Sequence, residues 1–179
     1  MDYRFKKMLL PLMITLFLLV SINFILSMFT IGNVLSTHTM QFNVVIIIFL
    51  CLQLKTPWLP ILIFVIQFFH NAFTLDGWAY GTLVGVLLSF LLMIVKDVVN
   101  TENRVTVIII NQIFQIIWYL FMGTILWIQG ISKGSFWHGF FVFLPGSFFV
   151  SLLSPVFFNF LNKIWKSSSL EETHMGNDV

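Results

Sequence analysis

The chain has 179 residues, of which 59% are hydrophobic and 9% are charged, and its formal net charge is +2. A soluble domain carries roughly 25% charged residues, so this composition excludes a water-exposed globular surface and indicates a membrane protein. The length accommodates one membrane domain, and the small net charge gives no support for a nucleic-acid partner.

Six apolar segments follow in chain order, and we expect each to cross the membrane as a helix of about 20 residues. The first covers residues 8–29. It follows a basic N-terminus, residues 1–7, and is too long for the apolar part of a cleaved signal peptide. The second segment, 42–54, and the third, 58–73, are short and form a tight hairpin. Such a pair either crosses a locally thinned bilayer or is shielded by the other helices.

The last three segments are longer and cover residues 78–99, 105–127 and 136–165. Pro145 and Pro155 interrupt the sixth, so a kink or a short interfacial segment is expected before its true span. The expected fold is an all-α membrane domain with six transmembrane helices, residues 8–165. A disordered cytoplasmic tail, residues 166–179, follows it.

The positive charges predict the orientation of the chain. When the six segments are threaded in and out of the membrane, eight of the nine Lys and Arg residues fall on one side. Lys and Arg stay in short cytoplasmic loops, so this side and both termini are predicted to be cytoplasmic. The external side receives only Lys133, and the cytoplasmic side receives Arg4, Lys6, Lys7, Lys55, Lys96, Arg104, Lys163 and Lys166.

Small and polar residues recur every four positions along the later segments. In lipid, such stripes are natural packing seams, because close approach and interhelical hydrogen bonds replace the hydrophobic drive. The candidate helix-packing or partner face consists of Gly77, Gly81, Gly85 and Ser89. The candidate polar seam consists of Asn111, Gln115, Tyr119 and Asn159. Whether the glycine face packs within the chain or receives a partner helix stays open.

A small polar group, His70, Asn71 and Asp76, lies near the outer end of the third segment. It is either an external polar site or an interfacial histidine satisfied by water and neighbouring amides. One His and one Asp are too few for a tetrahedral zinc site, and no nucleophile–base–acid set accompanies them. We therefore expect no catalytic residue, metal or cofactor, and a protein that is not an enzyme. Ion-coupled transport is disfavoured because no acid, Lys or Arg lies deep in a segment.

Two stretches carry a resemblance to a known family. Residues 153–166 combine a proline, an apolar run and a basic ending, and residues 68–95 place a polar turn before a glycine-bearing span. In these features, and in length and span pattern, the chain resembles the MreD family of bacterial rod shape-determining membrane proteins. It departs from the family at Asn71, near the place of a usual aspartate, in the turn at residues 74–77, and at Met40-Gln41, where a proline is usual.

The resemblance implies a non-enzymatic scaffold in the bacterial inner membrane that serves the cell-elongation machinery, peptidoglycan synthesis and cell shape. Its implied partners are membrane lipids and an MreC-like protein with a single span. The actin-like MreB filament and the peptidoglycan synthase pair of RodA and its penicillin-binding partner are further implied partners. A second copy of the chain is another candidate partner.

The MreD fold is also similar to the substrate-binding S-components of energy-coupling-factor vitamin transporters, which makes transport the alternative function. Those subunits dock to their energising partner through an Ala-x-x-x-Ala pattern on the first span. The first segment here has no alanine, and its nearest small pair, Ser21 and Ser27, has a different spacing. An anionic vitamin would want a cation on the outer side, where only Lys133 is expected. An assembly factor for another envelope complex is the third hypothesis.

Overall fold

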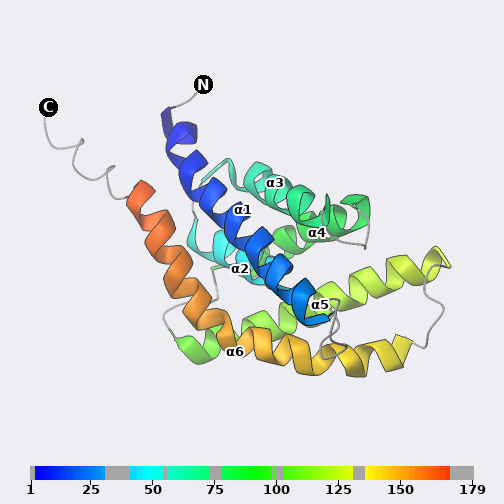
Figure 1. Ribbon diagram of the computed structural model, residues 1–179. Helices are drawn as coiled ribbons and strands as arrows, with labels where there is room; N and C mark the ends of the chain where they lie inside the picture. The colour runs from blue at the N-terminus through cyan, green and yellow to red at the C-terminus, as the bar shows by residue number, and fades with distance from the viewer. Residues whose placement is uncertain are drawn as a thin grey trace, which may run out of the picture.

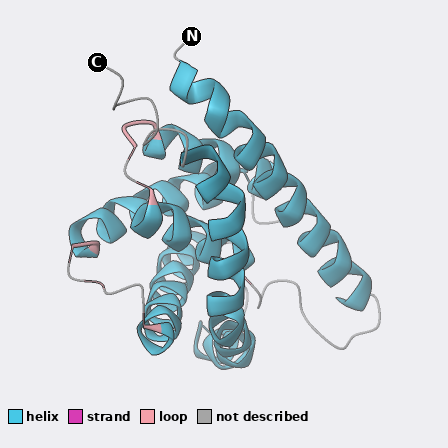
Figure 2. Ribbon diagram, turned by 90° about the vertical axis from the view of Figure 1, so that its left-hand side faces the viewer, coloured by secondary structure: helices cyan, strands magenta, loops and turns pink. Residues whose placement is uncertain are grey.

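The computed structural model describes residues 3–30, 41–54, 56–72, 78–97, 99, 103–130 and 136–169. Every regular element in these ranges is an α-helix (Figure 2). The expected all-α class is therefore confirmed for the described part of the chain. Its helices are α1 (Tyr3–Thr30), α2 (Phe42–Gln53), α3 (Leu59–Ala72), α4 (Trp78–Val95), α5 (Arg104–Ile128) and α6 (Phe136–Ser169).

Three of the described helices are long and apolar enough to cross a membrane, over Met8–Leu26, Arg104–Ile128 and Phe136–Lys166. The other three are shorter. Helix α2 has 12 residues, which is about 18 Å at 1.5 Å per residue, against a hydrocarbon core of about 30 Å. The three long helices agree with a membrane protein, and the count of six spans stays a prediction.

The helix ends follow local chemistry. The Asn103 side chain caps α5 by accepting a hydrogen bond from the backbone N–H of Val105 at 2.9 Å, which satisfies one of the unpaired donors of the first turn. Helix α4 ends at Val95, earlier than expected, where Lys96-Asp97 form a turn. Helix α6 runs to Ser169, so the first residues of the tail that was expected to be disordered are helical.

Helix α2 lies at the centre of the bundle, where each of the other described helices contacts it (Figure 1). Its residues 42–51 are all buried, and residues 44–48 have no accessible surface. A helix that is apolar on every side is stable only where apolar material surrounds it completely. Of the two situations considered for the short pair, shielding by the other helices therefore holds for α2 and not for α3, which exposes Ile61, Phe64 and Phe69.

Helices pack around α2 as two neighbouring pairs, α3 with α4 and α5 with α6, and α1 packs against α6 and α3. The start of α1 and the end of α6 lie at the same end of the molecule (Figure 1). There the indole Nε1 of Trp165 donates to Thr15 Oγ1 at 3.2 Å, and that hydroxyl donates to the Pro11 carbonyl at 2.7 Å. Both partners are buried, so this chain of hydrogen bonds holds α1 against α6.

Helix α6 contains two prolines and bends along its length (Figure 1). Pro155 lacks the N–H that would bond the carbonyl of Ser151, and its ring pushes against that turn. The hydroxyl of Ser154 donates to the freed Ser151 carbonyl at 2.6 Å. The helix therefore continues through Pro155 as a single bent helix, which is the kink expected for the sixth segment.

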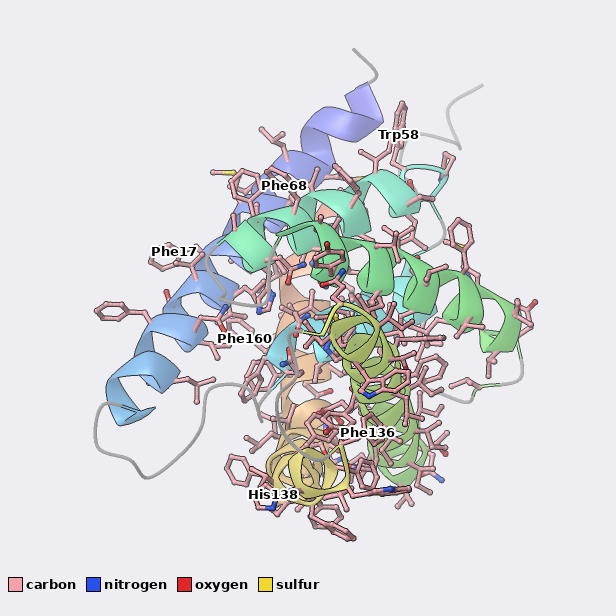
Figure 3. The ribbon with its side chains drawn as sticks, turned by 90° about the vertical axis from the view of Figure 1, so that its right-hand side faces the viewer. Phe17, Trp58, Phe68, Phe136, His138 and Phe160 are labelled. Carbon is pink, nitrogen blue, oxygen red and sulfur yellow. The ribbon has the colours of Figure 1, made fainter. Side chains whose placement is uncertain are left out.

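The surface of the described bundle is apolar, while its interior contains polar groups. Large hydrophobic side chains project outward from every helix except α2, among them Phe17 with 75% and Ile94 with 76% of their surfaces exposed (Figure 3 for Phe17). Monomers in water rarely expose contiguous apolar patches above a few hundred Å². This inverted distribution favours lipid as the surroundings of the bundle.

Candidate functional site

A cluster of amide side chains lies between α2, α3 and α4. Gln67 and Asn71 are one turn apart on α3, so their side chains share a face. Gln67 Oε1 accepts from Asn43 Nδ2 of α2 at 3.3 Å and from Asn71 Nδ2 at 3.5 Å. Asn71 Nδ2 also lies 3.4 Å from Thr82 Oγ1 of α4. All four residues are buried, so the cluster joins three helices inside the bundle.

The glycine face of α4 makes room for this cluster. A Cβ atom at Gly81 would lie 2.6 Å from Asn71 Cγ, and one at Gly85 would lie 2.7 Å from Gln67 Cδ. Both distances are shorter than side-chain atoms tolerate. The face therefore packs within the chain, and the groups seated on it are two amides of α3. Ser89 continues the face and donates to the Val86 carbonyl at 2.6 Å, whereas Gly77 lies outside the described residues.

His70 lies at the edge of the amide cluster and is 6% exposed. Its Nδ1 is 3.2 Å from Asn71 Oδ1. The two groups face each other across this distance, and the tautomer of His70 and the orientation of the Asn71 amide together set which of them donates. The expected external site thus brings His70 and Asn71 together, while Asp76 lies outside the described residues.

Two atoms of the amide cluster have no hydrogen-bond partner in the described part of the chain, Asn43 Oδ1 and Gln67 Nε2. The amide oxygen and nitrogen of Asn43, Gln67 and Asn71 can be exchanged together without changing this result. Asn43 then has an unpaired donor, and Gln67 has an unpaired acceptor. A buried amide group without a partner costs about 1–3 kcal/mol. The cluster therefore has one acceptor and one donor that the described residues leave unsatisfied.

A second polar cluster joins α5 to α6. Gln112 Nε2 donates to Ser147 Oγ at 3.1 Å, and Gln115 Nε2 donates to Ser151 Oγ at 3.4 Å. Asn111 Nδ2 donates to the carbonyl of Val107 at 2.8 Å on its own helix. The three amide oxygens, Asn111 Oδ1, Gln112 Oε1 and Gln115 Oε1, are buried and accept no hydrogen bond from the described residues.

The four residues of the expected polar seam do not lie together in the structure. Asn111 and Gln115 are fully buried in the second cluster. Tyr119 is half-buried near the far end of α5, where its hydroxyl donates to the Phe136 carbonyl at 3.1 Å. Asn159 is exposed on α6 and does not join the others. On α6, Ser147, Ser151, Pro155 and Asn159 recur every four residues. Each spacing of four advances about 40° more than one helical turn, so Asn159 points about 120° away from Ser147 around the helix.

Sequence inspection missed Asn43, Gln67, Thr82 and Gln112 as members of the two clusters. For Gln67, the sequence did contain a signal. Gln67 and Asn71 have the same spacing of four as Gly81 and Gly85, and the two pairs lie on consecutive segments that form a hairpin. When two large polar side chains on one helix have the same spacing as two glycines on the next, the pattern indicates that the large side chains pack against the glycines.

The described residues offer little for catalysis. Within them, no group of three or more His, Cys, Asp or Glu side chains lies close enough to hold a metal ion. An open hollow of about 310 Å³ between α5 and α6 is lined by Thr124, Trp127 and Phe136, which supply one hydroxyl and two aromatic rings. The polar chemistry of the described bundle therefore resides in the two amide clusters.

Comparisons with family models, with curated proteins and with solved structures find no match to this chain. The functional proposal therefore rests on the sequence, the fold and the two clusters.

Proposed function

We propose that the chain is a non-enzymatic scaffold of the bacterial inner membrane, with six spans and both termini in the cytoplasm. In this proposal it belongs to the cell-elongation machinery and holds a single-span partner of the MreC kind. Its resemblance to the MreD family supports the proposal, as does the distribution of Lys and Arg. The apolar exterior of the bundle supports the membrane location.

The observation that carries the scaffold proposal is the position of α2. Residues 42–51 of α2 are all buried and fill the centre of the described bundle, so no room for a ligand chamber is left there. A bundle filled in this way offers its partners surfaces on a densely packed body. In this proposal, lipid and the single span of a partner contact the large apolar side chains that α1, α4 and α6 expose.

Native mass spectrometry of gently purified protein tests the proposal. The expected result is a one-to-one or two-to-one complex with a single-span periplasmic protein. Depletion of the chain should then turn elongated cells round, because the synthase pair would lose its membrane organiser. A stoichiometric small-molecule adduct without any protein partner would contradict the scaffold function.

One observation favours the alternative, a substrate-binding S-component. Asn43 Oδ1 and Gln67 Nε2 are unpaired beside Asn71, and a small polar ligand with a donor and an acceptor would satisfy both. Because these atoms are enclosed by α2, α3 and α4, such a ligand would have to separate helices to enter. Retention of a vitamin-like molecule during purification would support this alternative.

Orientation gives a prediction that is independent of the partner. In a Cys51→Ser background, we expect Thr37→Cys and Lys133→Cys to react with a membrane-impermeant maleimide on intact cells. Lys96→Cys should react only after permeabilisation, because it belongs to the predicted cytoplasmic side. The buried Cys51 of the unaltered chain serves as the unreactive control. Reaction of position 37 only from the cytoplasmic side would contradict the six-span topology.

The variant His70→Gln tests whether His70 only forms hydrogen bonds in the first cluster or also has a chemical role. Glutamine keeps hydrogen bonding toward Asn71 and removes the titratable ring. For a scaffold, we expect normal expression and unchanged cell shape in a complementation assay. His70→Leu is the matched variant that removes the hydrogen bond as well. Loss of function in His70→Gln at normal protein level would assign His70 a chemical or ligand-binding role.

A further inference from the structure

The oxygens of the second cluster are oriented by the chemistry of their partners. The carbonyl of Val107 can only accept, so the group of Asn111 that faces it at 2.8 Å is the NH2 group. The hydroxyl of Ser147 gives its proton to the Leu144 carbonyl at 2.9 Å, and it therefore accepts from Gln112. In Asn111 and Gln112 the nitrogen is therefore engaged, and the oxygen is the atom left without a donor. In Gln115 it is likewise Nε2 that faces a hydroxyl, that of Ser151, and Oε1 that is left without a donor.

These amides occupy one small part of the bundle. Positions 111, 112 and 115 lie within about 100° of arc and about 6 Å of rise on α5. Gln112 and Gln115 both reach α6, at Ser147 and Ser151, which are themselves one turn apart. Asn111 and Gln115 have no accessible surface, and Gln112 is partly exposed but its Oε1 is buried. The three carbonyl oxygens therefore lie away from water, where unpaired polar groups are costly.

We propose that the α5–α6 cluster binds a monovalent metal cation of about the size of Na⁺. The ligands are Asn111 Oδ1, Gln112 Oε1 and Gln115 Oε1, assisted by the lone pairs of the Ser147 and Ser151 hydroxyls. A set of neutral oxygens suits hard cations and offers nothing to an anion or to a soft metal.

The charge of the ion follows from the absence of an acid among these ligands. A divalent ion would bring two charges into an apolar interior with no carboxylate to offset them. Neutral carbonyl oxygens, in contrast, replace the hydration shell of monovalent ions in membrane proteins. Such a site needs no ionisable residue within a span, so it is compatible with a bundle whose described interior contains no Asp, Glu, Lys or Arg. The ion would tie α5 to α6 next to the proline bend.

The test is thermal unfolding of the purified full chain, followed by tryptophan fluorescence, in NaCl, KCl, LiCl or choline chloride at constant ionic strength. A ligand that binds only the folded state raises the melting temperature in a saturable way. At a hundredfold excess over its dissociation constant, the expected rise is about 5–11 °C. We expect saturation with one alkali cation, weaker effects from the others and none from choline. Binding of radioactive ²²Na⁺ to the same sample measures the stoichiometry directly.

Three variants locate the effect. Gln112→Met/Gln115→Met keeps the side-chain length and removes two ligands, so the cation-dependent rise should disappear. Asn111→Asp adds a negative charge at the site and should tighten cation binding about tenfold or more. Asn159→Leu is the matched control, because it removes an exposed amide from α6 and should retain the full rise.

Each outcome decides the proposal. A melting temperature of the unaltered chain that does not depend on the cation would mean that the cluster holds only water and would overturn the proposal, whatever the response of Asn111→Asp. A rise that persists in the double methionine variant would place the ion elsewhere and would also overturn it. If the double variant fails to fold, Asn111→Asp still locates the site, because a rise of the same size and cation dependence as in the unaltered chain would place the ion elsewhere. None of these results depends on whether the chain is a scaffold.

Discussion

Replacing Ile47 by alanine should lower the free energy of unfolding by about 2–3 kcal/mol. Ile47 is 0% exposed at the middle of α2, and truncation of a buried isoleucine to alanine costs about 2–5 kcal/mol, part of it from the cavity left behind. We expect the lower part of that range, because unfolding in lipid or detergent returns the side chain to an apolar solvent. What is lost is mainly the packing contact that the cavity no longer supplies.

The matched control is Ile94→Ala. Ile94 lies on α4 with 76% of its surface exposed, so the same truncation leaves no internal cavity and should change the free energy of unfolding by less than about 0.5 kcal/mol. Reversible unfolding in mixed micelles measures both variants. Equal losses in the two variants would show that α2 is not enclosed as the structure has it, and would remove the main support for the scaffold proposal.

Gly85→Leu should be destabilising by about 1–3 kcal/mol and should disturb the amide cluster. A Cβ atom at this position meets the Gln67 side chain, and overpacking of a filled interior costs this amount. Displacing Gln67 also breaks its hydrogen bond with Asn43, so α2 loses a polar link to α3. Detergent stability and recovery of the partner complex are the measurements, and both should fall.

A double variant separates the clash from other effects of leucine. Gln67→Ala removes the side chain that the new leucine meets, so Gly85→Leu/Gln67→Ala should recover part of the loss, as expected for two residues in contact. Ala79→Leu places the same side chain at an exposed position of α4 and should be neutral. If Gly85→Leu is as harmless as Ala79→Leu, the glycine face does not seat the amides.

Much of the helical structure was predictable from the sequence. The second segment was expected at 42–54 and is found as α2 at Phe42–Gln53, and the fifth was expected at 105–127 and is found as α5 at Arg104–Ile128. Runs of apolar residues and a capping residue such as Asn103 are local signals. They determine where a helix begins and ends with little reference to its neighbours.

The tertiary structure alone decided which apolar helix is enclosed and which faces lipid. The sequences of α2 and α4 are both apolar on nearly every side, yet residues 42–51 of α2 are all buried while α4 exposes Leu83, Leu87 and Ile94. Lipid tails are as apolar as a protein interior, so hydrophobicity does not distinguish the two environments as it does in water.

The clusters were decided in the same way. The seam of four-residue spacing contained Asn111 and Gln115, but the rotation of each helix determined that Gln112 joins them and Asn159 does not. Likewise, the glycines of α4 were visible in the sequence, whereas their occupants, Gln67 and Asn71, became visible only in the packed hairpin. A side chain's partners depend on distances between helices, and no local pattern in a single helix contains those distances.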